Sequence, residues 1–183
     1  MKKTILIFGA SNSGTTTLGK AISKRYGFAH LDTDDYFFIP SDPPFANVRP
    51  VAERFALLEA DILKHENVVI TGSIMWGGDE SAVIKHLTLA IRLHVATDIR
   101  VERAKKREAE RFGKRILPGG DMYEEHQGFM EFVKSYDISG YEEGRSKEKH
   151  DIWQQSLQCP RIDVDSSRPV DEILAFIDEQ YPL

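Results

Sequence analysis

The stretch GASNSGTTT, residues 9–17, decides the fold of this chain of 183 residues. It follows an apolar run at residues 4–8 and precedes a segment of helical character at residues 18–26. Glycines at its two ends, Gly9 and Gly14, let the backbone turn tightly and direct successive N–H groups toward an anion, and the following helix adds the positive end of its dipole. Strand, glycine loop and helix together predict a phosphate-binding site.

The loop departs from the usual phosphate-loop pattern at one position. In the pattern G-x-x-x-x-G-K-[ST] the seventh residue is lysine, but Thr15 stands there, while Gly9, Gly14 and Thr16 keep the spacing. A lysine carries a point charge to the outer phosphates, and a hydrogen bond to a charged group contributes roughly 1.5 to 3 kcal/mol. We therefore expect weaker nucleotide binding. Lys20, about 7.5 Å further along the helix axis, is expected to be a poor replacement.

Composition indicates one soluble globular domain. Hydrophobic residues make up 41% and charged residues 29% of the chain, and its length suits a single core. A formal net charge of -5 argues against nucleic-acid or membrane-surface binding. No apolar run approaches the roughly 18 residues of a membrane span. The one cysteine, Cys159, forms no disulfide within the chain, so we expect a protein of the reducing cytoplasm.

Alternating strands and helices predict a parallel α/β sheet with right-handed crossovers. We expect strands at residues 4–8, 28–31, 67–71, 89–95 and 161–164, and helices at residues 18–26, 51–65, 98–112, 122–136, 146–157 and 169–180. Residues 36–50 are rich in aromatics and prolines and predict a shaped loop without a regular helix. Residues 113–121 predict a flexible basic loop, and residues 139–145 a break between helices.

Three carboxylates, Asp32, Asp34 and Asp35, follow the second predicted strand. They reach the carboxyl edge of the sheet, where ligands bind in open α/β folds. Ionised carboxylates at that place hold Mg²⁺, accept a proton from an acceptor hydroxyl or bind sugar hydroxyls. Capping of the next turn by Asp34 or Asp35 is the structural alternative.

Arginines recur along the helix predicted at residues 98–112. Arg103, Arg107 and Arg111 are spaced i, i+4, i+8 and form one stripe. Such a stripe is usually solvated and paired with acids, but its position at the entry of a basic loop favours a functional role. After the third strand, Gly72 leaves room for an acceptor, and Trp76 either stacks on a ring or closes the edge of the core.

The order of these features resembles that of small P-loop kinases of the adenylate kinase and shikimate kinase group, with a Walker A loop that lacks its lysine. The glycine loop, the acidic turn, Arg49 before a long helix, and the arginine helix entering a loop follow that group's order over nearly the whole chain. Residues 95–103 resemble the lid-entry segment of adenylate kinases. The resemblance implies one three-layer P-loop NTPase domain, residues 1–183, with an acceptor-binding insert at residues 36–66 and a lid at about residues 112–145.

The resemblance also implies the activity and the site. It implies phosphoryl transfer from ATP·Mg²⁺ to a small hydroxyl- or phosphate-bearing acceptor, with ATP, ADP and that acceptor as the only partners. The implied residues are Gly9, Ser11, Ser13, Gly14, Thr15, Thr16 and Thr17 for the phosphates, Arg103 against adenine, Thr16 and Asp32 for the metal, Asp32, Asp34, Arg107 and Arg111 for catalysis, and Arg49, Gly72, Trp76 and Arg115 for the acceptor.

Two departures keep other functions open. Thr15 replaces lysine, and residues 71–73 lack the signature with which nucleoside monophosphate kinases bind their acceptor, which speaks against adenylate kinase activity itself. The acidic turn is closer to that of shikimate and gluconate kinases. A nucleotide-binding regulatory module with little catalysis, and a slow NTPase, remain as alternatives.

Overall fold

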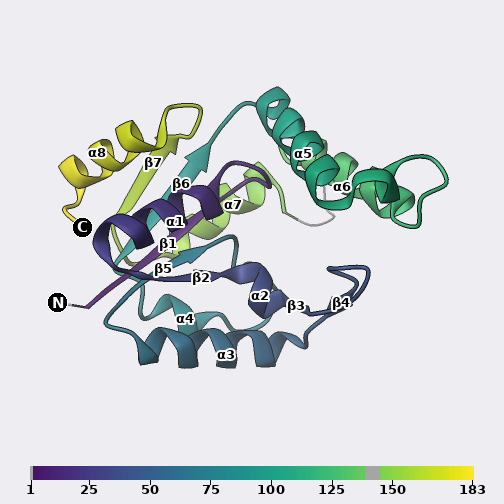
Figure 1. Cartoon of the computed structure of the whole chain (residues 1–183). Helices are drawn as coiled ribbons and strands as arrows, with labels where there is room; N and C mark the ends of the chain where they lie inside the picture. Colours follow the sequence, from purple (N-terminus) through teal and green to yellow (C-terminus); the bar gives the residue numbers. More distant parts are fainter. Residues whose placement is uncertain (1, 139–144) are drawn as a thin grey trace.

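A sheet of five parallel strands forms the centre of the computed structural model, which describes residues 2–138 and 145–183 (Figure 1). The strands are β1 (Lys3–Gly9), β2 (Ala29–Asp32), β5 (Asn67–Thr71), β6 (Leu89–His94) and β7 (Arg161–Asp165). They lie in the order β2-β5-β1-β6-β7, and every neighbouring pair is parallel. This confirms the sheet predicted from the sequence.

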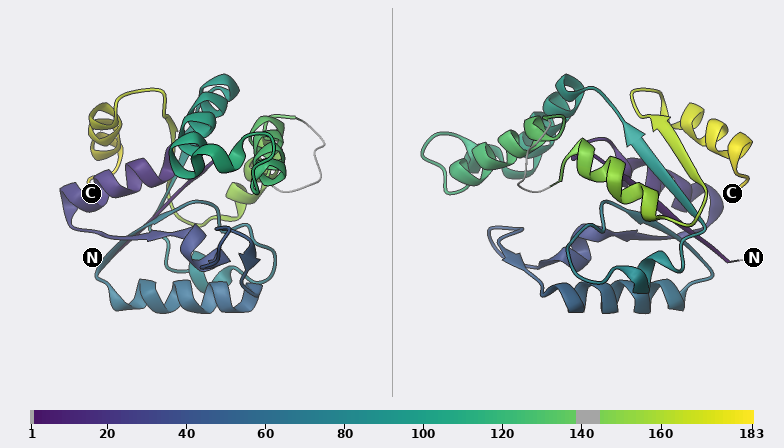
Figure 2. Two further views of the ribbon diagram at one scale, coloured as in Figure 1. Left: turned by 45° about the vertical axis from the view of Figure 1, so that its right-hand side comes forward. Right: turned by 180° about the vertical axis from the view of Figure 1, so that it is seen from behind.

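Helices cover both faces of this sheet, as the two views of Figure 2 show. The helices α1 (Thr15–Tyr26) and α8 (Val170–Gln180) pack on one face, and α3 (Val51–Lys64), α4 (Ser81–Ile84) and α7 (Lys147–Trp153), continued by the 3₁₀ turn η2 (Gln154–Ser156), lie on the other. Successive side chains of β1 serve opposite faces. Ile5 and Ile7 join the core under α1, whereas Leu6 and Phe8 join the core over α3.

Burial on both faces explains why β1 is a continuous apolar run rather than an alternating one. Ile5, Leu6 and Ile7 are fully buried, and each such side chain contributes about 1.5–3 kcal/mol relative to an exposed position. A strand in the middle of a parallel sheet has no solvated side. In the described part of the chain, no helix has both the length and the apolar character needed to cross a bilayer.

Two projections leave the carboxyl edge of the sheet on either side of the glycine loop (Figures 1 and 2). One consists of α2 (Thr33–Phe37) and the hairpin of β3 (Phe38–Ile39) and β4 (Asn47–Val48). The other is a helical arm of α5 (Thr97–Phe112), the 3₁₀ turn η1 (Gly113–Ile116) and α6 (Tyr123–Ser135). A small apolar cluster of Ala104, Met130 and Val133 joins α5 to α6.

The prediction of a loop without a regular helix at residues 36–50 was wrong at its start. The short helix α2 forms because the Asp32 carboxylate accepts a hydrogen bond from the Asp34 N–H at 3.2 Å, so Asp32 is the N-cap. The Tyr36 hydroxyl then donates to Asp61 on α3 at 2.8 Å and fixes the helix against its neighbour. The prolines all follow α2. The break predicted at residues 139–145 falls mostly on residues 139–144, outside the described residues.

The structure differs from the predicted helices in two further places. The helix α5 begins at Thr97, one residue before the predicted start, and Ala96 is its N-cap. The Thr97 hydroxyl accepts a hydrogen bond from Arg100 at 2.8 Å, within the same first turn. The helix α4 was not predicted, because four residues carry too little periodicity to be recognised.

The close approach of Thr33 requires a glycine at position 72, directly after β5. Its φ is 106°, and a Cβ built there would lie 1.9 Å from the Oγ1 atom of Thr33, a buried and stiffly branched side chain. We expect Gly72→Ala to lower the free energy of unfolding by about 3 kcal/mol or more, since backbone strain and overpacking add. Gly77→Ala is the matched control, because Gly77 also has a positive φ, 76°, but no described atom would lie within 4 Å of a Cβ at this residue. Its expected loss is about 1 to 2 kcal/mol.

Urea unfolding monitored by circular dichroism measures both variants. Equal losses for Gly72→Ala and Gly77→Ala would contradict the close approach between β5 and α2.

Candidate active site

The glycine loop forms an open turn whose N–H groups are available to an anion. Gly14 adopts a left-handed conformation, φ 100°. It is the N-cap of α1 and ends the loop directly before Thr15, the first residue of the helix. The first N–H groups of a helix have no backbone partner within it, and among the described residues no side chain caps α1 at Gly14. A Cβ at Gly9 would lie 2.6 Å from the carbonyl oxygen of Leu93, so the loop passes close to β6 without room for a side chain. The arrangement fits a bound phosphate.

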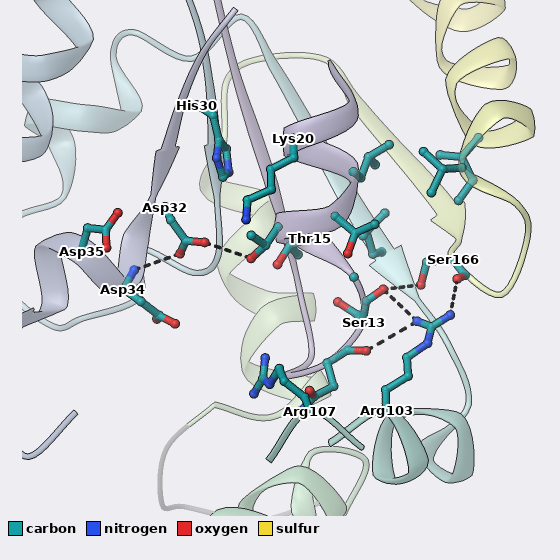
Figure 3. Close-up of a pocket in the computed structure, with 18 of the residues that line it drawn as sticks. Ser13, Thr15, Lys20, His30, Asp32, Asp34, Asp35, Arg103, Arg107 and Ser166 are labelled. Atoms are coloured by element: carbon teal, nitrogen blue, oxygen red, sulfur yellow. Dashed lines mark hydrogen bonds between the residues drawn. The ribbon is translucent and has the colours of Figure 1, made fainter. Parts of the chain in front are cut away.

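Arg103 of α5 holds this loop in place. Its Nη1 atom donates to the carbonyl oxygen of Ser13 at 3.3 Å, and its Nη2 atom donates to that of Ser166 at 2.9 Å (Figure 3). The Ser166 hydroxyl donates to the same Ser13 carbonyl at 2.7 Å. Three segments far apart in the sequence therefore meet at one backbone carbonyl. These bonds make Arg103 a positioning residue for the loop, and its proposed contact with adenine stays a prediction.

Asp32 links the loop to the acidic turn. Its Oδ2 atom accepts a hydrogen bond from the Thr16 hydroxyl at 2.9 Å, while its Oδ1 atom caps α2. Hard oxygen atoms of this kind suit Mg²⁺, which takes most of its ligands from water and phosphate. Within the described residues, no group of three or more His, Cys, Asp or Glu side chains is arranged to hold a metal ion by itself. The Thr16 and Asp32 oxygens thus fit a metal that is shared with a nucleotide.

Asp34 extends from the first turn of α2 to the side of the cleft on which Arg107 lies, whereas Asp35, which also lines the cleft, points away from Arg107 (Figure 3). Desolvation, followed by repulsion from the Asp32 carboxylate, raises the pKa of Asp34, while Arg145 and Arg107 act in the opposite direction. A carboxylate with a raised pKa binds a proton more readily. Asp34 is therefore the better placed of the two side chains to accept one.

Arg107 presents an unpaired guanidinium group to the cleft. Its Nε atom is buried and has no hydrogen-bond partner among the described residues. Desolvation, and then repulsion from the neighbouring Arg111, lower the pKa of Arg107. Keeping its guanidinium group charged in this place therefore costs free energy. The group lies over the ring of Phe129, 5.5 Å from the ring centre. A half-buried cation with an unpartnered, buried N–H group is suited to an anionic ligand.

The predicted residues surround one cleft with two adjoining lobes. The first lobe, about 790 Å³, lies beside the glycine loop, and the second, about 590 Å³, extends toward α6. Ser13, Gly14, Thr15, Thr16, Thr17 and Arg103 line the first lobe. Gly9, Ser11 and Gly72 line the second, and Thr15, Thr16, Asp32, Asp34, Arg107 and Arg111 line both. The structure thus brings together predicted residues from four separate segments.

Lys20 also lines the first lobe, although it was not predicted as a site residue, and its value as a replacement for the loop lysine stays a prediction. It extends from α1 toward Asp32 (Figure 3). Lys20 is four residues after Thr16 and so shares its helix face, and helical side chains lean toward the N-terminus of their helix. The distance of about 7.5 Å along the helix axis describes the backbone and does not include this lean of the side chain. Phe45, Glu108, His126 and Arg145 likewise line the second lobe without having been predicted.

Three of the four predicted acceptor residues, Arg49, Trp76 and Arg115, do not line the cleft. The Arg49 Nε atom donates to the carbonyl oxygen of Tyr36 at 3.1 Å, which ties the hairpin to α2. Trp76 packs on Phe55, with 4.9 Å between the ring centres, and belongs to the core over α3. Neither Arg49 nor Trp76 lines either described lobe. For Trp76, the packing supports closure of the core edge rather than stacking on a ligand.

Two further arginines are engaged in ion pairs. Arg115 contacts Asp121 at 2.6 Å and Asp42 at 3.0 Å, so it joins η1 to the hairpin segment and does not line the described cleft. Arg100 is buried and paired with Asp137. Arg100 therefore has a structural role.

Comparison with known proteins gives first a match of fold and then a family. The fold matches that of P-loop kinases: a shikimate kinase from Bacteroides thetaiotaomicron superposes over 100% of both chains with a TM-score of 0.59 and 17% sequence identity. A gluconokinase from Sinorhizobium meliloti 1021 gives a TM-score of 0.48 and 16% identity over 95% of this chain and 88% of its own. At these identities the likeness concerns the fold alone.

The family is that of a protein from Bacillus subtilis (strain 168). Over 172 residues the chain is 38% identical to the uncharacterized protein YqaC, a match that covers 94% of this chain and 93% of YqaC. The chain therefore belongs to the same family as YqaC. No model of a described protein family matches it.

Proposed function

We propose that this protein is a kinase that transfers the γ-phosphoryl group of ATP·Mg²⁺ to a hydroxyl or phosphate group of a small acceptor. The observation that carries the proposal is the meeting of four features in one cleft: a glycine loop, an Asp32–Thr16 oxygen pair, a carboxylate with a raised pKa, Asp34, and the half-buried Arg107, whose Nε atom is buried and has no partner among the described residues. Phosphoryl transfer depends on positioning and on charge stabilisation, which these groups provide.

Unpartnered polar atoms support a bound ligand. In the described part of the chain, four buried side-chain atoms lack a hydrogen-bond partner: Ser13 Oγ, Arg92 Nε, Arg107 Nε and His126 Nδ1. All except Arg92 belong to side chains that line the cleft. A buried polar group without a partner costs about 1–3 kcal/mol, so their concentration in one place favours a site completed by a ligand.

The chain's residues have distinct proposed roles in the transfer. The N–H groups at the start of α1 bind the phosphates, Thr16 and Asp32 hold the metal, and Arg107 with Arg111 stabilises charge on the transferring group. When bound, ATP·Mg²⁺ supplies the phosphoryl group and neutralises part of its charge. For a hydroxyl acceptor, Asp34 takes the hydroxyl proton. The bond from the γ-phosphorus to the bridging oxygen breaks, a bond to the acceptor oxygen forms, and ADP leaves.

We further propose that residues 36–66 form the acceptor-binding insert and that residues at about 112–145 act as a lid. The hairpin and the helical arm support this division, because both border the second lobe. Residues 139–144 of the proposed lid lie outside the described residues. The free Cys159 and the ATP donor favour a cytoplasmic location.

Formation of ADP from ATP and Mg²⁺ tests the activity. The whole chain is assayed with nucleosides, nucleoside monophosphates, sugar acids and other small hydroxy acids, and without any acceptor. A kinase gives ADP formation that depends on one class of acceptor. Equal ADP formation in every reaction, including the control without acceptor, would instead identify an NTPase.

Thr15 favours one rival function, a nucleotide-binding module with little catalysis, because the lysine that reaches the outer phosphates is missing. Thr15→Lys is expected to raise ATP affinity about tenfold or more through a charged hydrogen bond. Calorimetric titration with ATP·Mg²⁺ measures this, and the ADP assay is run in parallel. A kinase keeps or increases transfer, whereas a binding module gains affinity alone. Unchanged affinity would argue that the loop is not the phosphate site.

A further inference from the structure

The second lobe of the cleft is bordered by aromatic rings from the hairpin segment and from two helices of the helical arm. Phe38 and Phe45, in edge-to-face contact with 5.1 Å between ring centres, belong to the hairpin segment. The rings of Phe112, Phe129 and Phe132 come from α5 and α6. We name this part of the second lobe the aromatic slot. Rings on two sides favour a ligand with flat faces, because such faces stack well on aromatic side chains.

A buried acid and a half-buried imidazole also line the aromatic slot. Glu108 of α5 is 7% exposed, and its Oε2 atom lies 3.7 Å from the Nδ1 atom of His126 on α6, too far for a hydrogen bond. The His126 Nδ1 atom has no partner among the described residues. Nor does any described residue donate a hydrogen bond to the Glu108 carboxylate. Two adjacent groups, one buried and one half-buried, with unused hydrogen-bonding capacity indicate a ligand contact.

We propose that the aromatic slot binds the flat ring of the acceptor, and that Glu108 and His126 recognise a ring edge carrying N–H donors. The identification of this ligand as the phosphoryl acceptor rests on the proposed kinase function, whereas the binding of a flat ring in the slot does not. An ionised carboxylate only accepts hydrogen bonds, so the ligand edge beside Glu108 must donate them. A ring edge without N–H or O–H donors would leave that carboxylate unsatisfied.

The position of the aromatic slot agrees with phosphoryl transfer to a hydroxyl group of the ligand whose ring the slot binds. The second lobe is continuous from the aromatic slot to Asp34, Thr16 and Gly9. Its volume of about 590 Å³ lies within the range of small-molecule sites, about 300–1,000 Å³. A nucleoside-sized acceptor with its ring at Glu108 therefore has room for a hydroxyl near Asp34. An aliphatic hydroxy acid would leave the aromatic faces uncovered.

Three purine nucleosides that differ only at the ring edge test this proposal. Guanosine presents two adjacent N–H groups, adenosine one amino group, and purine riboside no edge N–H donor. Calorimetric titration of the whole chain, saturated with a non-hydrolysable ATP analogue and Mg²⁺, is expected to rank their affinities in that order. Glu108→Gln is expected to weaken guanosine binding by about tenfold, since a charged acceptor is lost, and to leave purine riboside unchanged.

Glu110→Gln is the matched control, because Glu110 lies on the same helix, is exposed and pairs only with Lys106, at 3.9 Å, among the described residues. His126→Asn is the second variant if Glu108→Gln does not fold. A purely structural role of Glu108 would lower the melting temperature but weaken all three nucleosides equally, and this would overturn the proposal. Binding of the ATP analogue without binding of any purine nucleoside would also overturn it, while leaving the kinase function standing. No binding of the analogue would instead contradict the kinase function.

Discussion

Replacement of Arg107 by alanine is expected to lower turnover about a thousandfold while the fold stays intact. A cation that stabilises charge on a transferring phosphoryl group commonly contributes this much. The Arg107 guanidinium lines both lobes, its Nε atom has no described partner, and burial already lowers its pKa. Its removal therefore breaks no ion pair of the described structure. Steady-state kinetics with the acceptor found by the ADP assay, and a thermal melt, measure the two effects.

Lys106→Ala is the control for this prediction. Lys106 neighbours Arg107 in α5, is exposed and contacts Glu110 at 3.9 Å, so the control removes a cation from the same helix without touching the cleft. Its turnover is expected to match that of the unmodified chain. Turnover of Arg107→Ala equal to that of Lys106→Ala would remove the assignment of Arg107 to the transfer step.

Asp34→Asn is expected to lower turnover of a hydroxyl acceptor by about 10²- to 10⁴-fold, the usual contribution of a general base. The pH dependence adds a second signature. Desolvation raises the pKa of Asp34, and the residue accepts a proton only when ionised. Activity should therefore fall as the pH drops through this raised pKa, at a higher pH than for an ordinary aspartate. The asparagine variant should lack that acidic limb of the pH–rate profile.

Asp35→Asn tests the neighbouring carboxylate under the same conditions. Asp35 points away from the side of the cleft where Arg107 and Asp34 lie (Figure 3). We expect its variant to keep the acidic limb and most of the activity. An acidic limb that persists in Asp34→Asn and disappears in Asp35→Asn would reverse the two assignments.

The sheet and the glycine loop were predictable because their signals are local. The strand β1 is recognisable from a continuous run of apolar residues, and Gly9 and Gly14 mark the turn that follows. Asp32 was predictable for the same reason, since it ends a strand and begins a turn. Each of these features depends on residues adjacent in the sequence.

The remaining parts of the site depend on contacts between distant segments. The carbonyl group of Ser13 that Arg103 contacts is 90 residues away in sequence, and no local pattern reveals it. Glu108 and His126 look like ordinary polar residues of two helices, and only the packing of α5 on α6 buries them side by side. Arg115 shows the reverse case, because the family resemblance implied a contact with a ligand, whereas the structure pairs it with Asp42 and Asp121.

The fate of the γ-phosphoryl group tests the central proposal most directly. The whole chain is incubated with Mg²⁺, ATP labelled with ³²P at the γ position, and the panel of acceptors, and the products are separated. The kinase function predicts label on one class of acceptor, and loss of that label in Arg107→Ala. Label that appears only as inorganic phosphate, or never leaves ATP, would contradict it.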